Sequence, residues 1–192
     1  VVLLPMTAGS IVLAYNLPGV ENLKLSRAAY AGVFLGKITK WSDPAIAAAN
    51  PGVKLPDTPI TVVTRSDGSG TTYVFTNHLA AVSEAWKSGP GVGTSVQFPV
   101  GVGGKGNAGV TALLKQTPGA IGYVEFGYAE QTKMPMAVLE NKSGKYVKAD
   151  LASAQAALAD VELPPDLRAW IPDPASPVVA VDLDVRRRLA AH

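Results

Sequence analysis

Short apolar segments alternate with polar breaks along most of the chain. Apolar runs rich in β-branched residues predict strands, and apolar positions at helical spacing predict helices. The predicted strands are residues 11–15, 60–64, 96–100, 121–125, 137–139, 146–147 and 178–181, with residues 1–5 as a further candidate. The predicted helices are residues 27–35, 45–50, 72–82, 108–115 and 151–159, and residues 126–131 form a helical turn. Because strands and helices alternate, the pattern predicts an α/β domain with a central mixed sheet flanked by helices.

Local signals set several of these boundaries. Ser26 is an N-cap candidate for the helix that begins at residue 27, and Gly36 ends that helix. Asp43 and Pro44 open the next helix, and residues 141–144 form the turn of a predicted hairpin. Beyond residue 162 the pattern weakens, because prolines crowd a short span at Pro164, Pro165, Pro172, Pro174 and Pro177.

Composition narrows the possible functions. The chain is 47% hydrophobic and 17% charged, a composition typical of globular proteins. Its 192 residues are enough for one domain with a well-buried core. A net charge of +2 gives no reason to expect nucleic acid as a partner. The sequence contains no cysteine, which excludes disulfides and argues against a structural zinc site. No apolar run reaches the roughly 18 residues of a membrane span. The first residues lack Met and a basic segment, so we expect a mature form or a fragment.

The most informative motif is a polar, glycine-rich loop between a predicted strand and a predicted helix. It reads Arg65-Ser66-Asp67-Gly68-Ser69-Gly70-Thr71-Thr72. The first N–H groups of a helix lack partners within the helix and carry partial positive charge, so they can bind an oxyanion. Arg65 can add a bidentate pair of hydrogen bonds. Gly68 and Gly70 would allow close approach and positive φ, and Ser69 and Thr71 add hydroxyl donors. A capped turn that binds nothing explains the same residue types, so these residues alone leave both interpretations open.

Two other motifs compete for a function. Residues 101–106 match the G-x-G-x-x-G pattern of dinucleotide-binding sites, and Glu125 lies near the spacing expected for a ribose-binding acid. Pro99 interrupts the preceding short strand, so a second loop near the cleft is the preferred interpretation. Lys105 in that loop either adds positive potential to the cleft or is simply solvated. A serine hydrolase would need a base beside Ser69, and His78 lies about two turns into the following helix.

Seven segments follow one another in an order and spacing that match a known family: residues 15–19, 34–41, 43–46, 50–52, 65–72, 102–107 and 119–125. Together they resemble the substrate-binding protein of the bacterial ABC phosphate importer. The resemblance covers about residues 5–150. It implies the second lobe of a type II periplasmic-binding-protein fold.

The resemblance also implies a function. In that family, phosphate is held between two lobes. Arg65, Ser69, Gly70 and Thr71 would be the ligands of this lobe, and Asp67 would orient Arg65. The other lobe would add donors and an acceptor carboxylate that favours phosphate over sulfate. The resemblance implies a periplasmic or cell-surface protein that works with the membrane subunits of an importer. It implies no catalytic residue, metal or cofactor.

The sequence departs from that family at both ends. Val1 falls where the family's chain has just crossed from its N-terminal lobe, so a missing lobe or a second chain is expected to complete the site. We divide the chain into a lobe at residues 1–163 and a proline-rich, divergent segment at residues 164–192. The alternative is an isolated lobe that serves as an interaction or scaffold module without useful phosphate binding.

Overall fold

A mixed six-stranded sheet forms the centre of the computed structural model, which describes residues 9–159, 170–171, 173 and 181–182. The strands lie in the order β4 (Val102–Gly104), β3 (Thr61–Arg65), β5 (Ala120–Glu125), β1 (Gly9–Asn16), β9 (Val181–Asp182) and β8 (Trp170–Ile171). β3 is parallel to β4 and β5, whereas β1 is antiparallel to β5 and β9. The predicted mixed α/β architecture is therefore confirmed.

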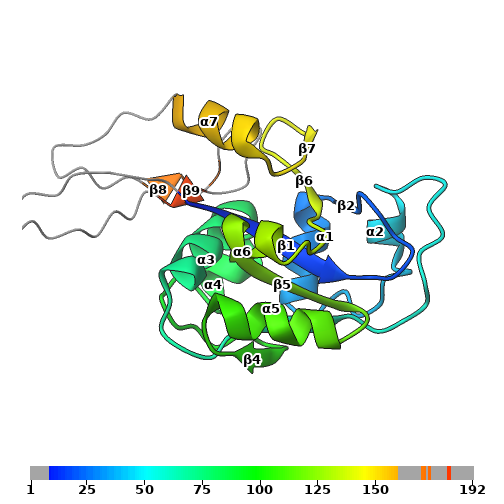
Figure 1. The fold of residues 1–192 in the computed structure, drawn as a ribbon, viewed down its shortest axis with the longest axis horizontal. Helices are drawn as coiled ribbons and strands as arrows, with labels where there is room; N and C mark the ends of the chain where they lie inside the picture. The colour runs from blue at the N-terminus through cyan, green and yellow to red at the C-terminus, as the bar shows by residue number, and fades with distance from the viewer. Residues whose placement is uncertain (1–8, 160–169, 172, 174–180, 183–192) are drawn as a thin grey trace, which may run out of the picture.

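Helices cover both faces of this sheet (Figure 1). α1 (Arg27–Phe34) and α3 (Gly70–Val82) pack with the larger hydrophobic core, and α5 (Gly106–Gln116) packs with the smaller one on the opposite face. α6 (Phe126–Gln131) contacts β1, β5 and α5. The remaining helices are α2 (Pro44–Ala47), α4 (Glu84–Ser88) and α7 (Leu151–Ala159).

The side chains of β1 show how one strand serves both cores. Ile11, Leu13 and Tyr15 belong to the larger core, whereas Val12 and Ala14 belong to the smaller one. Successive side chains of a strand point to opposite faces, so a strand covered on both sides has to be apolar throughout. This explains why β1 is a continuous apolar run in the sequence.

A small second sheet joins β2 (Lys24–Leu25), β6 (Val138–Glu140) and β7 (Tyr146–Val147). β6 and β7 form the predicted antiparallel hairpin, with Gly144 at a φ of 75° in the turn. The side-chain oxygen of Asn141 accepts hydrogen bonds from the N–H groups of Ser143 and Lys145, which closes the turn.

Most predicted helix boundaries agree with the structure. Ser26 caps α1 by accepting a hydrogen bond from the N–H of Ala29, and Gly36 follows the helix at a φ of 70°. α7 spans Leu151–Ala159, as predicted. α2 is shorter than predicted and ends at Ala47. Beyond it, the side-chain amide of Asn50 donates to the carbonyl oxygens of Ile46 and Lys24.

The structure differs from the prediction at three places within residues 84–104. Residues 96–100 form no strand; Val96 and Phe98 instead pack against the larger core from a loop. The outermost strand of the large sheet, next to β3, is instead β4, which lies inside the segment predicted to be a glycine-rich loop. α4 was not predicted at all, although Ser83 caps it by accepting from the N–H of Trp86.

Some predictions fall outside the described residues, namely the strand at residues 1–5, most of the strand at 178–181 and most of the proline-rich segment. The division at residue 163 therefore stays a prediction. Within the described part of the chain, no helix is long and apolar enough to cross a bilayer.

The topology brings several chain segments to one end of the large sheet, the end at which β3 and β5 finish. β3 and β5 are parallel, so their carboxyl ends, at Arg65 and Glu125, reach the same end of the sheet. β1 runs the other way and pairs Ile11 with Glu125, so it begins at this end. The loop that carries the candidate residues leaves β3 here and enters α3.

Candidate anion-binding site

The first turn of α3 presents unused backbone donors. Ser69 is the N-cap, and its Oγ accepts a hydrogen bond from the N–H of Thr72 at 3.2 Å. The N–H of Ser69 itself donates to the carbonyl oxygen of Thr94 at 2.8 Å. Within the described residues, the N–H groups of Gly70 and Thr71 have no hydrogen-bond acceptor. Since Ser69 accepts through its oxygen, its hydroxyl proton also remains available for a ligand.

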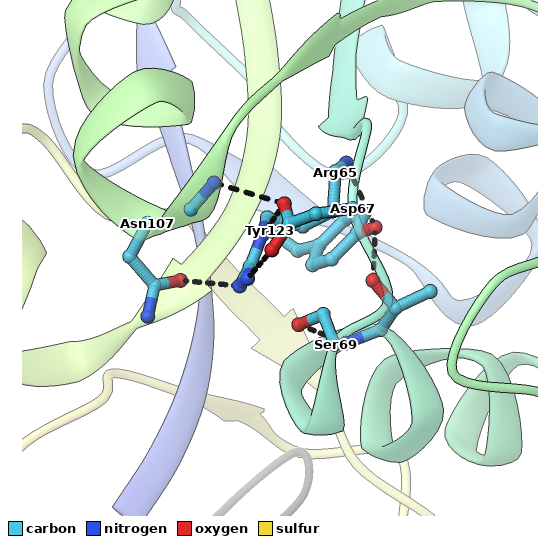
Figure 2. Close-up of polar contacts among 7 residues, drawn as sticks. Arg65, Asp67, Ser69, Asn107 and Tyr123 are labelled. Atoms are coloured by element: carbon cyan, nitrogen blue, oxygen red, sulfur yellow. Dashed lines mark hydrogen bonds and ion pairs between the residues drawn. The ribbon is translucent and has the colours of Figure 1, made fainter.

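Arg65, the last residue of β3, forms a side-on ion pair with Asp67. Its Nε lies 2.9 Å from one carboxylate oxygen and its Nη2 lies 2.6 Å from the other (Figure 2). The N–H of Gly106, at the start of α5, donates to the same carboxylate at 2.9 Å. The Arg65 side chain is 10% exposed and that of Asp67 is 34% exposed. Asp67 is thus held from two sides, and it fixes the plane of the guanidinium.

The ion pair leaves one edge of the guanidinium available. An arginine has five N–H donors, and Asp67 takes only Nε and one hydrogen of Nη2. Nη1 lies 3.5 Å from Oδ1 of Asn107, a long and weak contact. The edge formed by Nη1 and Nη2 can therefore make the paired hydrogen bonds that a tetrahedral oxyanion accepts.

Mutual contact keeps both members of the pair ionised. The hydrogen bond from Arg65, followed by that from Gly106, holds the pKa of Asp67 well below its usual range. The hydrogen bond to Asp67 in turn raises the pKa of Arg65. The two charges cancel, so an anion here would be attracted by oriented donors and the helix dipole rather than by a net positive charge.

A buried tyrosine lies beneath the loop and was not singled out from the sequence. Tyr123 of β5 is 0% exposed. Its hydroxyl oxygen accepts a hydrogen bond from the N–H of Arg65 at 3.1 Å and lies 2.8 Å from Oγ1 of Thr72 (Figure 2). Burial raises the pKa of this hydroxyl. The second glycine-rich segment was expected near this loop, but the contacts of Gly106 with Asp67 and of Asn107 with Arg65 were not predicted, because they join residues far apart in the sequence.

The expected conformation of the loop glycines was wrong. Neither Gly68 nor Gly70 has a positive φ, whereas Gly106 has a φ of 67°. A Cβ added at Gly68 would meet no atom within 4 Å, so the surface there is open. Close packing instead occurs at Gly104, where an added Cβ would lie 2.6 Å from the backbone nitrogen of Val110. That glycine lets β4 and α5 approach each other.

The competing motifs serve other purposes in the structure. Residues 101–106 contain the edge strand β4, and the N–H of Gly106 is bonded to Asp67. Glu125 caps α6 by accepting from the N–H of Gly127. His78 is 2% exposed, and its Nε2 lies 2.9 Å from the hydroxyl of Tyr30. Lys105 is exposed and precedes α5.

Other features give no competing site among the described residues. They contain no group of three or more His, Asp or Glu side chains that could hold a metal ion. Trp41 and Trp86 are fully buried, as expected for core residues, whereas the side chain of Trp170 lies outside the described residues.

An α/β sheet covered on both faces, with the free N-terminus of a helix at the carboxyl ends of its strands, is the arrangement expected for one lobe of a solute-binding protein. The chain belongs to the PBP superfamily, since the model of the PBP superfamily domain matches residues 1–179. The fold is the type II lobe expected from the sequence.

Proteins named phosphate-binding protein PstS are among its relatives. The PstS of Xylella fastidiosa (strain Temecula1) is 49% identical over 160 residues, which cover 82% of this chain and 44% of that protein. The PstS of Methanocaldococcus jannaschii is 44% identical over 179 residues, covering 88% of this chain and 44% of that protein. The chain thus spans less than half the length of these relatives. The resemblance to phosphate-binding proteins is confirmed.

Solved structures show the same fold. A high-affinity periplasmic phosphate-binding protein, PfluDING, bound with phosphate superposes with a TM-score of 0.72 at 23% identity, over 94% of this chain and 56% of that one. An ABC-type phosphate transport receptor from Vibrio cholerae gives a TM-score of 0.56 at 22% identity, over 81% and 53% of the two chains.

Proposed function

We propose that this chain binds inorganic phosphate through Arg65, Ser69, Gly70 and Thr71, with Asp67 orienting Arg65. The proposal rests chiefly on the donors that the folded chain leaves unused: the outer edge of Arg65, the hydroxyl of Ser69 and the N–H groups of Gly70 and Thr71. All of them belong to the end of β3 and the first turn of α3, which one short loop connects.

Each donor suits an oxygen of a tetrahedral anion. The two amides at the start of α3 can share one phosphate oxygen, as helix N-termini do with anions. Arg65 can bind a second oxygen or bridge two, since its Nη1–Nη2 edge is free. Ser69 can donate its proton while its oxygen continues to cap the helix. Thr71 offers both an amide and a hydroxyl.

We further propose that the chain is one lobe of the substrate-binding component of an ABC phosphate importer. The relatives named PstS support this, although the chain spans less than half of their length. A second lobe or chain would then cover the remaining oxygens of the phosphate, and the membrane subunits of the importer would be partners. The proposed role is binding rather than catalysis, in a protein exported to the periplasm or cell surface.

Titration of the ¹⁵N-labelled chain tests the binding proposal. Phosphate should shift the amide resonances of Gly70 and Thr71 in a saturable way, and NAD should leave residues 101–107 unchanged. Isothermal titration of the same sample gives the heat of binding. If saturating phosphate leaves the amides of residues 65–72 unmoved, the proposed site is wrong.

The rival function is that of an isolated lobe that acts as an interaction or scaffold module without useful phosphate binding. The same titration separates the two functions. A scaffold module would show no saturable response to phosphate at residues 69–71. Its well-dispersed amide spectrum would show that the chain is nevertheless folded.

A further inference from the structure

The hydroxyl of Tyr123 lies between the two halves of the proposed phosphate site. One half is the end of β3, which carries Arg65, and the other is the first turn of α3, which contains Thr72. Tyr123 belongs to neither element, since it lies on β5. Its oxygen is 3.1 Å from the backbone nitrogen of Arg65 and 2.8 Å from Oγ1 of Thr72. One buried atom thus connects the strand that ends in the arginine with the helix that supplies the amides.

The surroundings leave this hydroxyl no solvent to replace either contact. Tyr123 is 0% exposed and Thr72 is 1% exposed. A buried polar group that loses its partner keeps the full cost of its desolvation. Without the Tyr123 hydroxyl, the buried hydroxyl of Thr72 and the partly buried N–H of Arg65 would each lose this hydrogen-bond partner.

The ring of Tyr123 is held as firmly as its hydroxyl. It stacks on Phe75 of α3 with a centroid distance of 4.5 Å and an interplanar angle of 22°. On the loop before β4, Phe98 stacks on it at 5.8 Å and 20°. The same loop supplies Thr94, whose carbonyl oxygen accepts the N–H of Ser69. Aromatic contacts of this kind allow little movement of the ring, so the position of the hydroxyl is set by the core.

We propose that Tyr123 is a positioning residue that fixes the spacing between Arg65 and the first turn of α3, and thereby the affinity for phosphate. The inference rests on the proposed function, because it concerns the same site. Oxyanion recognition depends on donors placed at set distances from one another, and a small shift of the helix relative to Arg65 would weaken several contacts together.

Tyr15 supplies a matched control. It is also 0% exposed, its hydroxyl donates to the carbonyl oxygen of Val20, and its oxygen accepts from the N–H of Leu23. The hydroxyl therefore bridges two backbone groups away from the site. Tyr123→Phe and Tyr15→Phe remove the same atom from equally buried sites with two partners each. Both variants should lose comparable stability.

Phosphate affinity and amide hydrogen exchange, measured on the full chain, give the test. Tyr123→Phe should weaken phosphate binding about three- to tenfold, whereas Tyr15→Phe should leave it unchanged. Thr72→Val should weaken binding as Tyr123→Phe does. Thr72→Ser, which keeps the hydroxyl, should retain most of the wild-type affinity. Equal losses in the two tyrosine variants, or none in Tyr123→Phe, would overturn the proposal.

Hydrogen exchange without phosphate separates this proposal from the function on which it rests. In Tyr123→Phe, the hydrogen-bonded amides of Arg65 and Thr72 should exchange faster, and in Tyr15→Phe the affected amide should be that of Leu23. If the wild-type chain binds no phosphate, the proposed function fails, yet the exchange pattern still reports whether Tyr123 holds the loop. Unchanged exchange at residues 65–72 in Tyr123→Phe would refute the positioning role.

Discussion

The guanidinium of Arg65 is bound along one side by Asp67 and left available at its end. Nε and Nη2 lie 2.9 Å and 2.6 Å from the two carboxylate oxygens, while Nη1 makes only a long contact of 3.5 Å with Asn107. An unpaired arginine loses rotamer entropy when it binds a ligand. Here Asp67 has already restricted the side chain, so a bound anion would find its donors in place.

The first prediction compares two cations near the site. Arg65→Ala removes a charge-assisted pair of hydrogen bonds worth about 1.5–3 kcal/mol, so the Kd for phosphate should rise at least about tenfold. Lys105 is exposed, and Lys105→Ala should change the Kd far less. Isothermal titration of both variants measures the difference. Equal effects would mean that Arg65 contributes only long-range charge.

The second prediction concerns acid. Because the pKa of Asp67 is lowered in the folded chain, its contribution to stability is complete above the ordinary carboxyl pKa of about 4 and is lost as the pH falls through the lower, folded value. Asp67→Asn removes this contribution, so its stability should fall less steeply below about pH 4 than that of the wild type. Urea unfolding at several acidic pH values provides the comparison. A carboxylate resonance of Asp67 that titrates at the ordinary pKa would contradict the ion pair.

Two N-cap serines allow the binding role of Ser69 to be separated from its structural role. Ser69 and Ser26 each accept a backbone N–H at 3.2 Å, from Thr72 and Ala29. Ser69→Ala and Ser26→Ala should therefore each cost about 1 kcal/mol of stability. Only Ser69→Ala should also weaken phosphate binding. A loss of affinity in both variants, in proportion to their loss of stability, would reduce Ser69 to a cap.

The fourth prediction concerns affinity. A single lobe leaves half of the anion in water, where high dielectric and salt weaken each contact. The chain alone should bind phosphate with a Kd on the order of millimolar, or about −4 kcal/mol, and should discriminate poorly against sulfate. Titrations with both anions at low and high ionic strength give these values. Submicromolar, selective and salt-insensitive binding would show that a second chain or the C-terminal segment completes the site.

The last prediction concerns a second bidentate ion pair. Nη1 and Nη2 of Arg27, at the start of α1, lie 2.6 and 2.8 Å from the carboxylate oxygens of Asp173, and the two side chains are only 24% and 14% exposed. Asp173→Asn should cost about 1–2 kcal/mol in the free energy of unfolding, between the values for exposed and buried pairs. The exposed pair Lys40–Asp57 is the control, and Asp57→Asn should matter much less.

The elements predicted best are those whose signals are local. Ser26 and Gly36 mark the ends of α1 by capping chemistry that involves only neighbouring residues. The predictions that failed concern elements whose structure depends on contacts between residues far apart in the sequence. Val96 and Phe98 have the apolar alternation of a strand, but they pack against the core from a loop, and the β-ladder with β3 forms at residues 102–104 instead.

The candidate site shows the same contrast between local signals, which the sequence reveals, and long-range contacts, which it does not. The motif from Arg65 to Thr72 could be singled out because its residue types and its place before a helix suit an oxyanion, although the same residues also fit a capped turn and the binding roles came from the resemblance. Tyr123, by contrast, looks like any aromatic residue in a buried strand, and only the folded chain brings its hydroxyl to Arg65 and Thr72. The start of α5 reaches Asp67 for the same reason, at a separation of 39 residues.

The pairing of β1 with β9 has a practical consequence. Gly9 lies opposite Asp182 in an antiparallel ladder, so the two strands run side by side in opposite directions at the end of the sheet that carries the anion loop. Antiparallel partners have Cα atoms about 5 Å apart, which is a gap that a surface loop of another protein can span. Residues 9–182 could thus be inserted into a surface loop of a fluorescent protein. A change in the distance between β1 and β9 would then change the fluorescence, which would give a direct assay for the proposed phosphate binding.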